Sequence, residues 1–154
     1  MTNLRSLLAA AIAAATLLAA PATAQSAAPT VTLSTQGGGH GLNALRRSAG
    51  LAPLAEDPRL TRAAAGHAAW MARNGTMSHS GANGSSFADR ASAAGYCYRM
   101  LAENVAYGTQ DPGTVLSWWM SSTGHRRNIL NPGVSHYGLA AHADRWVLLV
   151  AAPC

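Results

Sequence analysis

Apolar side chains recur at helical spacing between residues 57 and 75, and this is the clearest structural signal in the chain. Asp57 followed by Pro58 is typical of a helix start, because the Asp side chain caps free N–H groups and proline fits the first helical position. Asn74 and Gly75 indicate the end of the helix. The predicted buried stripe consists of Leu60, Ala63, Ala64, His67, Trp70 and Met71.

Two more helices are predicted by the polar residues at their starts. Ser86 and Asp89 have the spacing of a capping box, and this helix is expected to end at Gly95. Asp111, which precedes a proline, predicts another helix that ends near Gly124. The positions that support the second of these helices are Val115, Trp118, Trp119 and Ser122.

The remaining segments predict a mixed fold. Residues 42–48 are expected to form a short helix that ends near Gly50, and residues 96–110 an irregular or extended segment. Residues 135–141 and 145–152 have the apolar patterns of strands and are joined by a short turn. The second run is apolar on both faces, as in a strand covered on both sides. Helices followed by an antiparallel hairpin indicate the α+β class.

The N-terminus has the features of a secretory signal peptide. Arg5 supplies a positive charge, residues 7–20 are almost entirely apolar, and an Ala-x-Ala cleavage site precedes residue 25. The apolar run, about 14 residues, is shorter than the roughly 20 that a membrane span needs, so we expect no transmembrane segment in the mature chain. We therefore predict a signal peptide at 1–24, a flexible linker at 25–40 and one domain at 41–154, exported to the periplasm or the extracellular space.

Composition excludes some classes of function. The 154 residues are 49% hydrophobic and only 11% charged, which is typical of one folded domain and not of a disordered chain. The formal net charge is +5 and Lys is absent, but the basic residues form no dense stripe beyond the pairs Arg46-Arg47 and Arg126-Arg127. A nucleic-acid-binding protein normally carries such a stripe, so we expect no nucleic-acid partner. We expect a monomer.

The two cysteines, Cys97 and Cys154, have an obvious use in an exported protein, where disulfides form and persist. A bridge between them would tie the end of the chain to its middle. The alternative is two free, buried thiols.

The candidate chemistry lies mainly in histidines. His79 and His125 each follow the end of a predicted helix, and Glu103 lies in a stretch without helical period. Local zinc, CxxC and GxSxG signatures are absent from the sequence. Ser122 precedes His125 closely, which alone favours a structural role at a helix end. The other histidines are interpreted as packing or surface residues, namely His40, His67, His136 and His142.

Six segments in order resemble the CAP superfamily, which includes cysteine-rich secretory proteins, antigen 5 and plant pathogenesis-related proteins. They are LNALRRSAGLAPLAEDPRL, AAAGHAAWMARNGTMSH, FADRASAAGY, AENVAYG, SWWMSSTGHRRNILNP and the closing GLA…WVLLVAAPC. The resemblance covers residues 41–154 and is of the bacterial secreted type. It implies a three-layer α-β-α sandwich with a mainly antiparallel central sheet and one open cleft.

The resemblance also implies which residues line that cleft. His79, Glu103 and His125 match the family's cleft motifs, and in some members such a cluster binds a divalent ion. Eukaryotic members carry an acid three residues after the helix Trp, but Ser122 stands at that spacing from Trp119 here. We therefore expect a thin ligand set for Zn²⁺ or another divalent metal, formed by His79, His125 and, as a third candidate, Glu103.

Three functions stay open on this basis. The first is a non-enzymatic module that binds a lipid, glycan or peptide in the cleft. The second is a hydrolase in which a metal-bound water, or Ser122 activated by His125, attacks an amide or ester. The catalytic candidates are then His79, Glu103, His125 and Ser122. The third is a scaffold in which the cleft histidines have a stabilising role.

Overall fold

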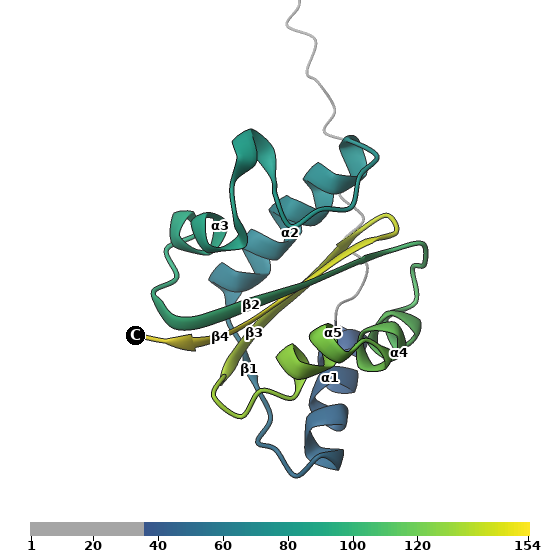
Figure 1. The fold of residues 1–154 in the computed structure, drawn as a ribbon, viewed down its shortest axis with the longest axis vertical. Coiled ribbons are helices and arrows are strands. Elements are labelled where there is room, and N and C mark those ends of the chain that lie inside the picture. Colours follow the sequence, from purple (N-terminus) through teal and green to yellow (C-terminus); the bar gives the residue numbers. More distant parts are fainter. Residues whose placement is uncertain (1–35) are drawn as a thin grey trace, which may run out of the picture.

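The computed structural model describes residues 36–154, which form a four-stranded sheet between two helical layers (Figure 1). The strand order is β1 (Ala55–Glu56), β3 (His136–His142), β4 (Arg145–Pro153) and β2 (Tyr98–Tyr107). Only the β1–β3 pair is parallel, and the other pairs are antiparallel. The prediction of an α+β, three-layer sandwich is confirmed. The predicted signal peptide at 1–24, and most of the predicted linker, lie outside the described residues.

The helices divide between the two faces of the sheet (Figure 1). α2 (Pro58–Arg73) and α3 (Phe87–Ala93) form one layer, and α2 packs directly on β3 and β4. α1 (Gln36–Ser48), α4 (Pro112–Ser121) and α5 (Thr123–Ile129) form the other. None of the helices in residues 36–154 is long and apolar enough to span a membrane.

The central hairpin separates two hydrophobic cores. Successive side chains of a strand point to opposite faces, so Leu139 and Leu148 face α1, α4 and α5, while Ala140 and Leu149 face α2 and α3. Every residue of β4 between its two ends is buried. This confirms that the second apolar run is a strand covered on both sides.

The predicted helix starts are confirmed by their caps. The Asp57 side chain accepts a hydrogen bond from the backbone N–H of Arg59. Ser86 and Asp89 form the full capping box, with each side chain bonded to the other residue's backbone N–H. Asp111 accepts from the N–H of Thr114 at 2.7 Å. Each cap satisfies donors that a helix's first turn leaves free.

Two predicted boundaries need correction. α1 begins at Gln36 and not at residue 42, so the end of the predicted linker belongs to a helix. The helix predicted to end near Gly124 ends at Ser121, because Ser122 is extended (φ −97°, ψ 121°) and the chain then starts α5. The segment predicted as irregular or extended at 96–110 is extended, because it contains the strand β2, with one register shift between Tyr98 and Met100.

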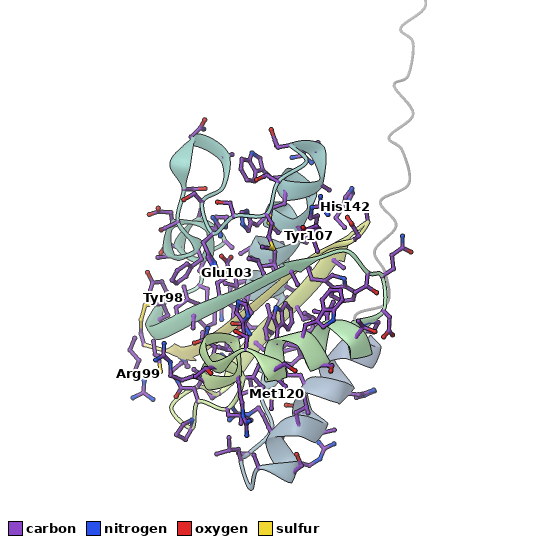
Figure 2. The ribbon with its side chains drawn as sticks, turned by 45° about the vertical axis from the view of Figure 1, so that its right-hand side comes forward. Tyr98, Arg99, Glu103, Tyr107, Met120 and His142 are labelled. Atoms are coloured by element: carbon purple, nitrogen blue, oxygen red, sulfur yellow. A yellow bond between two sulfur atoms is a disulfide. The ribbon has the colours of Figure 1, made fainter. Side chains whose placement is uncertain are left out.

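β2 is an edge strand of the sheet (Figure 1), and two of its backbone carbonyls accept hydrogen bonds from side chains of α4 and α5. Trp119 Nε1 donates to the carbonyl of Val105 at 3.1 Å, and Asn128 Nδ2 to the carbonyl of Glu103 at 3.4 Å. Covered carbonyls remove a template for pairing with another strand. Glu103 lies midway along this strand, between the two helical layers (Figure 2).

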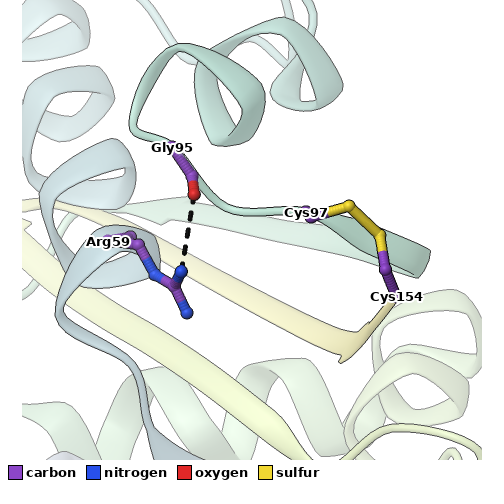
Figure 3. Close-up of a disulfide and its surroundings, with 4 residues drawn as sticks. All are labelled: Arg59, Gly95, Cys97 and Cys154. Carbon is purple, nitrogen blue, oxygen red and sulfur yellow. Dashed lines mark hydrogen bonds between the residues drawn. A yellow bond between two sulfur atoms is a disulfide. The ribbon is translucent and has the colours of Figure 1, made fainter.

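A disulfide joins Cys97, just before β2, to Cys154, just after β4 (Figure 3). The prediction of this bridge is confirmed, and the alternative of two free thiols is wrong. Beside it, Arg59 donates to the carbonyl of Gly95 at 3.5 Å, which links the start of α2 to the turn before β2. The bridge fixes the end of β4 against the strand that carries Glu103.

Candidate functional site

Glu103 is held by two partners from different elements. Its side chain is fully buried, and its Oε1 accepts from Nδ1 of His79 at 2.9 Å. Arg90 of α3 donates through Nη2 to the other carboxylate oxygen at 2.7 Å. Because the carboxylate accepts at both oxygens, His79 must carry its proton on Nδ1, which leaves Nε2 free. The His79 side chain is 55% exposed, and its Nε2 has no hydrogen-bond partner among residues 36–154.

The loop that carries His79 is fixed by buried side chains through its backbone carbonyls. His67 of α2 bonds through Nε2 to the carbonyl of Ser78 at 2.7 Å, and Arg90 donates to the carbonyl of His79 at 3.1 Å. Burial lowers the pKa of His67, and the positive charge of Arg90 lowers it further. A neutral His67 that packs in the core and positions this loop agrees with the prediction of a packing residue.

His125 reaches the same region from the opposite helical layer. It lies within α5, not beyond a helix end as predicted, and Asn104 of β2 donates to its carbonyl at 3.1 Å. Asn128 donates in turn to the side-chain oxygen of Asn104 at 2.8 Å. Burial lowers the pKa of His125, and the nearby His79 lowers it further when charged. Both effects favour a neutral imidazole at pH 7.

An open hollow of about 290 Å³ lies next to His125. Three of its lining side chains are large, apolar and about half exposed: Met77 at 48%, Tyr107 at 53% and Trp118 at 45%. Its other lining residues are Val105, Ala106, Trp119 and Ser122. Trp118 thus lines a surface, whereas Trp119 beside it is part of the core.

The structure brings His79 and Glu103 into contact and places His125 near them, whereas the hollow is lined by His125 and Ser122. Within the described residues Ser122 makes no side-chain hydrogen bond to His125; it lies between α4 and α5 and lines the hollow.

The other histidines are used elsewhere. His136 bonds to the hydroxyl of Tyr96 at 2.9 Å, His142 is half-buried in the hairpin, and His40 is exposed on α1.

Sequence reasoning missed Arg90, Met77 and Tyr107 at this site. Arg90 has the pattern of an ordinary helix residue, and no spacing rule brings it to Glu103. A second hollow, of about 560 Å³ between α1 and α4, was also missed. It is lined by Gly41, Ala44, Leu45, Ser48, Gly113, Leu116, Ser117 and Met120.

This architecture matches a known family. The model of the cysteine-rich secretory protein family, CAP, matches residues 40–148. The chain belongs to the CAP family. Its α+β sandwich is therefore the fold of a CAP domain.

The relatives of this CAP domain include larger proteins. YkwD of Bacillus subtilis is 36% identical over 97 residues, which cover 63% of this chain and 38% of YkwD. An extracellular SCP-domain protein of Bacillus anthracis superposes with a TM-score of 0.73 at 26% identity, covering 75% of this chain and 39% of the other. An outer surface protein of Borrelia burgdorferi superposes with a TM-score of 0.71 at 20% identity, covering 80% of this chain and 98% of the other. At this identity the likeness shows the fold alone. The chain spans well under half of the first two proteins.

The donor set for a metal in this CAP domain is small. No group of three His, Cys, Asp or Glu side chains within residues 36–154 is arranged to hold a metal ion. Both carboxylate oxygens of Glu103 are engaged by His79 and Arg90. The nitrogens that remain as candidate donors are Nε2 of His79 and the imidazole of His125.

Proposed function

We propose that this CAP domain is an exported module that binds a ligand in the cleft beside His79 and His125. One observation carries the proposal. Apart from Met100, the large apolar side chains exposed in residues 36–154 all line one hollow: Met77, Tyr107 and Trp118. Grouped apolar exposure beside a few polar groups is typical of binding sites. Export is supported by the predicted signal peptide, by the disulfide and by the extracellular location of the Bacillus anthracis relative.

The polar side of the cleft is arranged before any ligand arrives. Glu103 orients the ring of His79, and Arg90 holds both the Glu103 carboxylate and the His79 carbonyl. A side chain that is already fixed loses little conformational entropy on binding. His79 offers an acceptor at Nε2 when neutral and a donor when protonated, so it suits a hydroxyl, an amide or an anionic group.

The three ligand classes differ in the surface they would use. A peptide or a glycan fits the cleft of Trp118 and Tyr107, because aromatic faces accept apolar groups and tolerate adjacent water. A lipid acyl chain would instead fit the hollow between α1 and α4, whose lining includes Leu45, Leu116 and Met120. Variants on the two surfaces therefore separate the lipid class from the others.

Trp118→Ala is expected to weaken ligand binding at least roughly tenfold, because half-exposed aromatic anchors contribute strongly to binding. Its free energy of unfolding should change little, since Trp118 lies at the surface. Binding is measured by calorimetry against arrays of peptides, oligosaccharides and phospholipid vesicles. Met100→Ala removes an exposed apolar side chain outside the cleft and is the matched control.

Two results would contradict this proposal. One is the absence of saturable binding to every class of probe. The other is binding that survives both Trp118→Ala and His79→Ala while His79→Ala lowers the melting temperature, as the scaffold alternative requires.

A divalent ion is proposed to tune the same cleft. Two imidazoles leave most coordination positions to water or to the ligand, so we expect weak binding and not a structural zinc site. Titration of the metal-stripped protein with Zn²⁺ should show saturable binding that both His79→Ala and His125→Ala abolish. His142→Ala, in the hairpin turn, should leave the titration unchanged. Binding that persists without His79 would place the ion elsewhere.

A hydrolase is the second candidate, and the Glu103–His79 pair favours it. A base held by a buried carboxylate is a recurring element of nucleophilic catalysis. Within the described residues, however, no hydroxyl or thiol is hydrogen-bonded to the ring of His79 or His125. The reaction would need a water, or movement of Ser122. Turnover of a peptide or ester that is unchanged in both His79→Ala and His125→Ala would remove this candidate.

A further inference from the structure

A third hollow adjoins the hollow beside His125. It has a volume of about 380 Å³, and Met77 and Tyr107 line it as well as the first hollow. Its remaining lining consists of Gly75, Thr76 and Arg145. The surface available to a ligand therefore continues from His125, past Met77 and Tyr107, to an arginine that no sequence signal singled out.

Arg145 is fixed by three contacts. Its Nε donates to the carbonyl of Thr76 at 3.1 Å, its Nη1 to Asp144 at 2.6 Å, and its guanidinium lies 4.8 Å from the ring centre of Tyr107. Only 15% of the side chain is exposed. Nη2 has no hydrogen-bond partner among residues 36–154, and it is not among their buried unpaired atoms. One nitrogen of an immobilised guanidinium, Nη2, is thus open to a ligand.

The charge and shape of the groove restrict what it can hold. A fixed guanidinium recognises a carboxylate through charge-assisted hydrogen bonds, and here Nη2 is the nitrogen that can donate them. Asp144 already takes Nη1, so one carboxylate fits and a polyanion does not. Besides the Tyr107 hydroxyl that they share, the hollow beside His125 offers the hydroxyl of Ser122, and the hollow beside Arg145 offers that of Thr76. A sugar ring brings several hydroxyls, and burying them without hydrogen-bond partners costs free energy. The groove therefore suits a peptide better than a glycan.

Met77 between the two hollows favours apolar side chains of varied shape, since methionine adapts to different partners. We propose that this groove binds the C-terminal segment of an apolar peptide. The terminal carboxylate lies on Nη2 of Arg145, and the last side chains pack against Met77, Tyr107 and Trp118. This inference rests on the proposed function and adds the class of ligand and its direction in the cleft.

The test uses N-acetylated tetrapeptides with apolar residues at the last two positions, each made as a free acid and as a C-terminal amide. Calorimetry with the wild-type protein should give roughly tenfold tighter binding of the acids. In Arg145→Gln the affinity for the acids should fall to the affinity for the amides, while the affinity for the amides stays the same. Asp144→Asn removes the negative charge beside Arg145 and should tighten binding of the acids a few-fold. Arg73→Gln, an exposed arginine outside the hollows, is the matched control.

Several outcomes would overturn the inference. Acids and amides that bind the wild type equally would remove the carboxylate contact, with no variant needed. Equal weakening of acids and amides by Arg145→Gln would show that Arg145 only holds the loop at Thr76. If an oligouronate binds and none of the peptides does, the ligand class is an acidic glycan and not a peptide. In each case binding that still depends on Trp118 would leave the proposed function standing, whereas no dependence on Trp118 would remove both.

Discussion

Glu103→Ala is expected to lower the free energy of unfolding by about 3–5 kcal/mol, the usual cost of breaking a buried ion pair from one side. Glu103 is fully buried, and Arg90 opposite is only 12% exposed. Without the carboxylate, the Arg90 guanidinium keeps its charge and retains only the carbonyls of Ser85 and His79 as acceptors. Its Nε already lacks a partner. Urea unfolding monitored by tryptophan fluorescence measures the change.

The double variant Glu103→Leu/Arg90→Met separates the uncompensated charge from other causes. Replacing both members of a buried pair with apolar side chains of similar volume is often close to neutral, so the double variant should recover most of the lost stability. Glu56→Ala is the matched control, because Glu56 is exposed and its side chain accepts from the Thr61 hydroxyl without an arginine partner. A loss below about 1 kcal/mol in Glu103→Ala would show that the pair contributes no more than a surface ion pair.

The same double variant tests what Glu103 does for the site. Its stability recovers, but the ring of His79 loses the acceptor at Nδ1 and its carbonyl loses Arg90. We therefore expect ligand binding to stay weak in a protein that is again stable. Recovery of both properties together would mean that the orientation of His79 does not matter for binding.

Local chemistry made much of the fold predictable from sequence. Asp57, Ser86 and Asp111 each satisfy backbone donors within three residues, so the starts of α2, α3 and α4 are encoded next to the helices they begin. The apolar run of β4 predicts burial on both faces, because every side chain in it must leave water. Such signals need no knowledge of the distant chain.

The features that sequence reasoning missed depend on contacts between distant elements. Gly124 has the character of a helix end, yet the break occurs at Ser122, whose extended backbone is chosen by the packing of α4 and α5. Arg90 meets Glu103 only because the sheet places β2 beside α3. The family motifs supplied His79, Glu103 and His125, whereas Met77 and Tyr107 share a hollow through tertiary folding alone.

Gly138→Ala is expected to destabilise the protein by about 3 kcal/mol or more, at the upper end of the usual cost of overpacking. Gly138 lies buried in β3, directly under α2. A Cβ there would overlap the backbone carbonyl carbon of Leu60 and the backbone nitrogen of Thr61. A side chain can rotate away from such an overlap, but the backbone of a helix cannot, so α2 as a whole must move away from the sheet.

Gly66→Ala is the matched control, and it should have the opposite sign. Gly66 is exposed within α2, and no atom lies within 4 Å of the position its Cβ would take. Alanine in a helix interior is roughly 0.5–1 kcal/mol more favourable than glycine, so this variant should be slightly more stable than the wild type. Because α2 carries His67, which holds the Ser78 carbonyl, Gly138→Ala should also weaken binding in the cleft. Equal stability of the two variants would show that α2 does not depend on its close approach to Gly138. The inference that this approach helps to position the His79 loop would then be wrong.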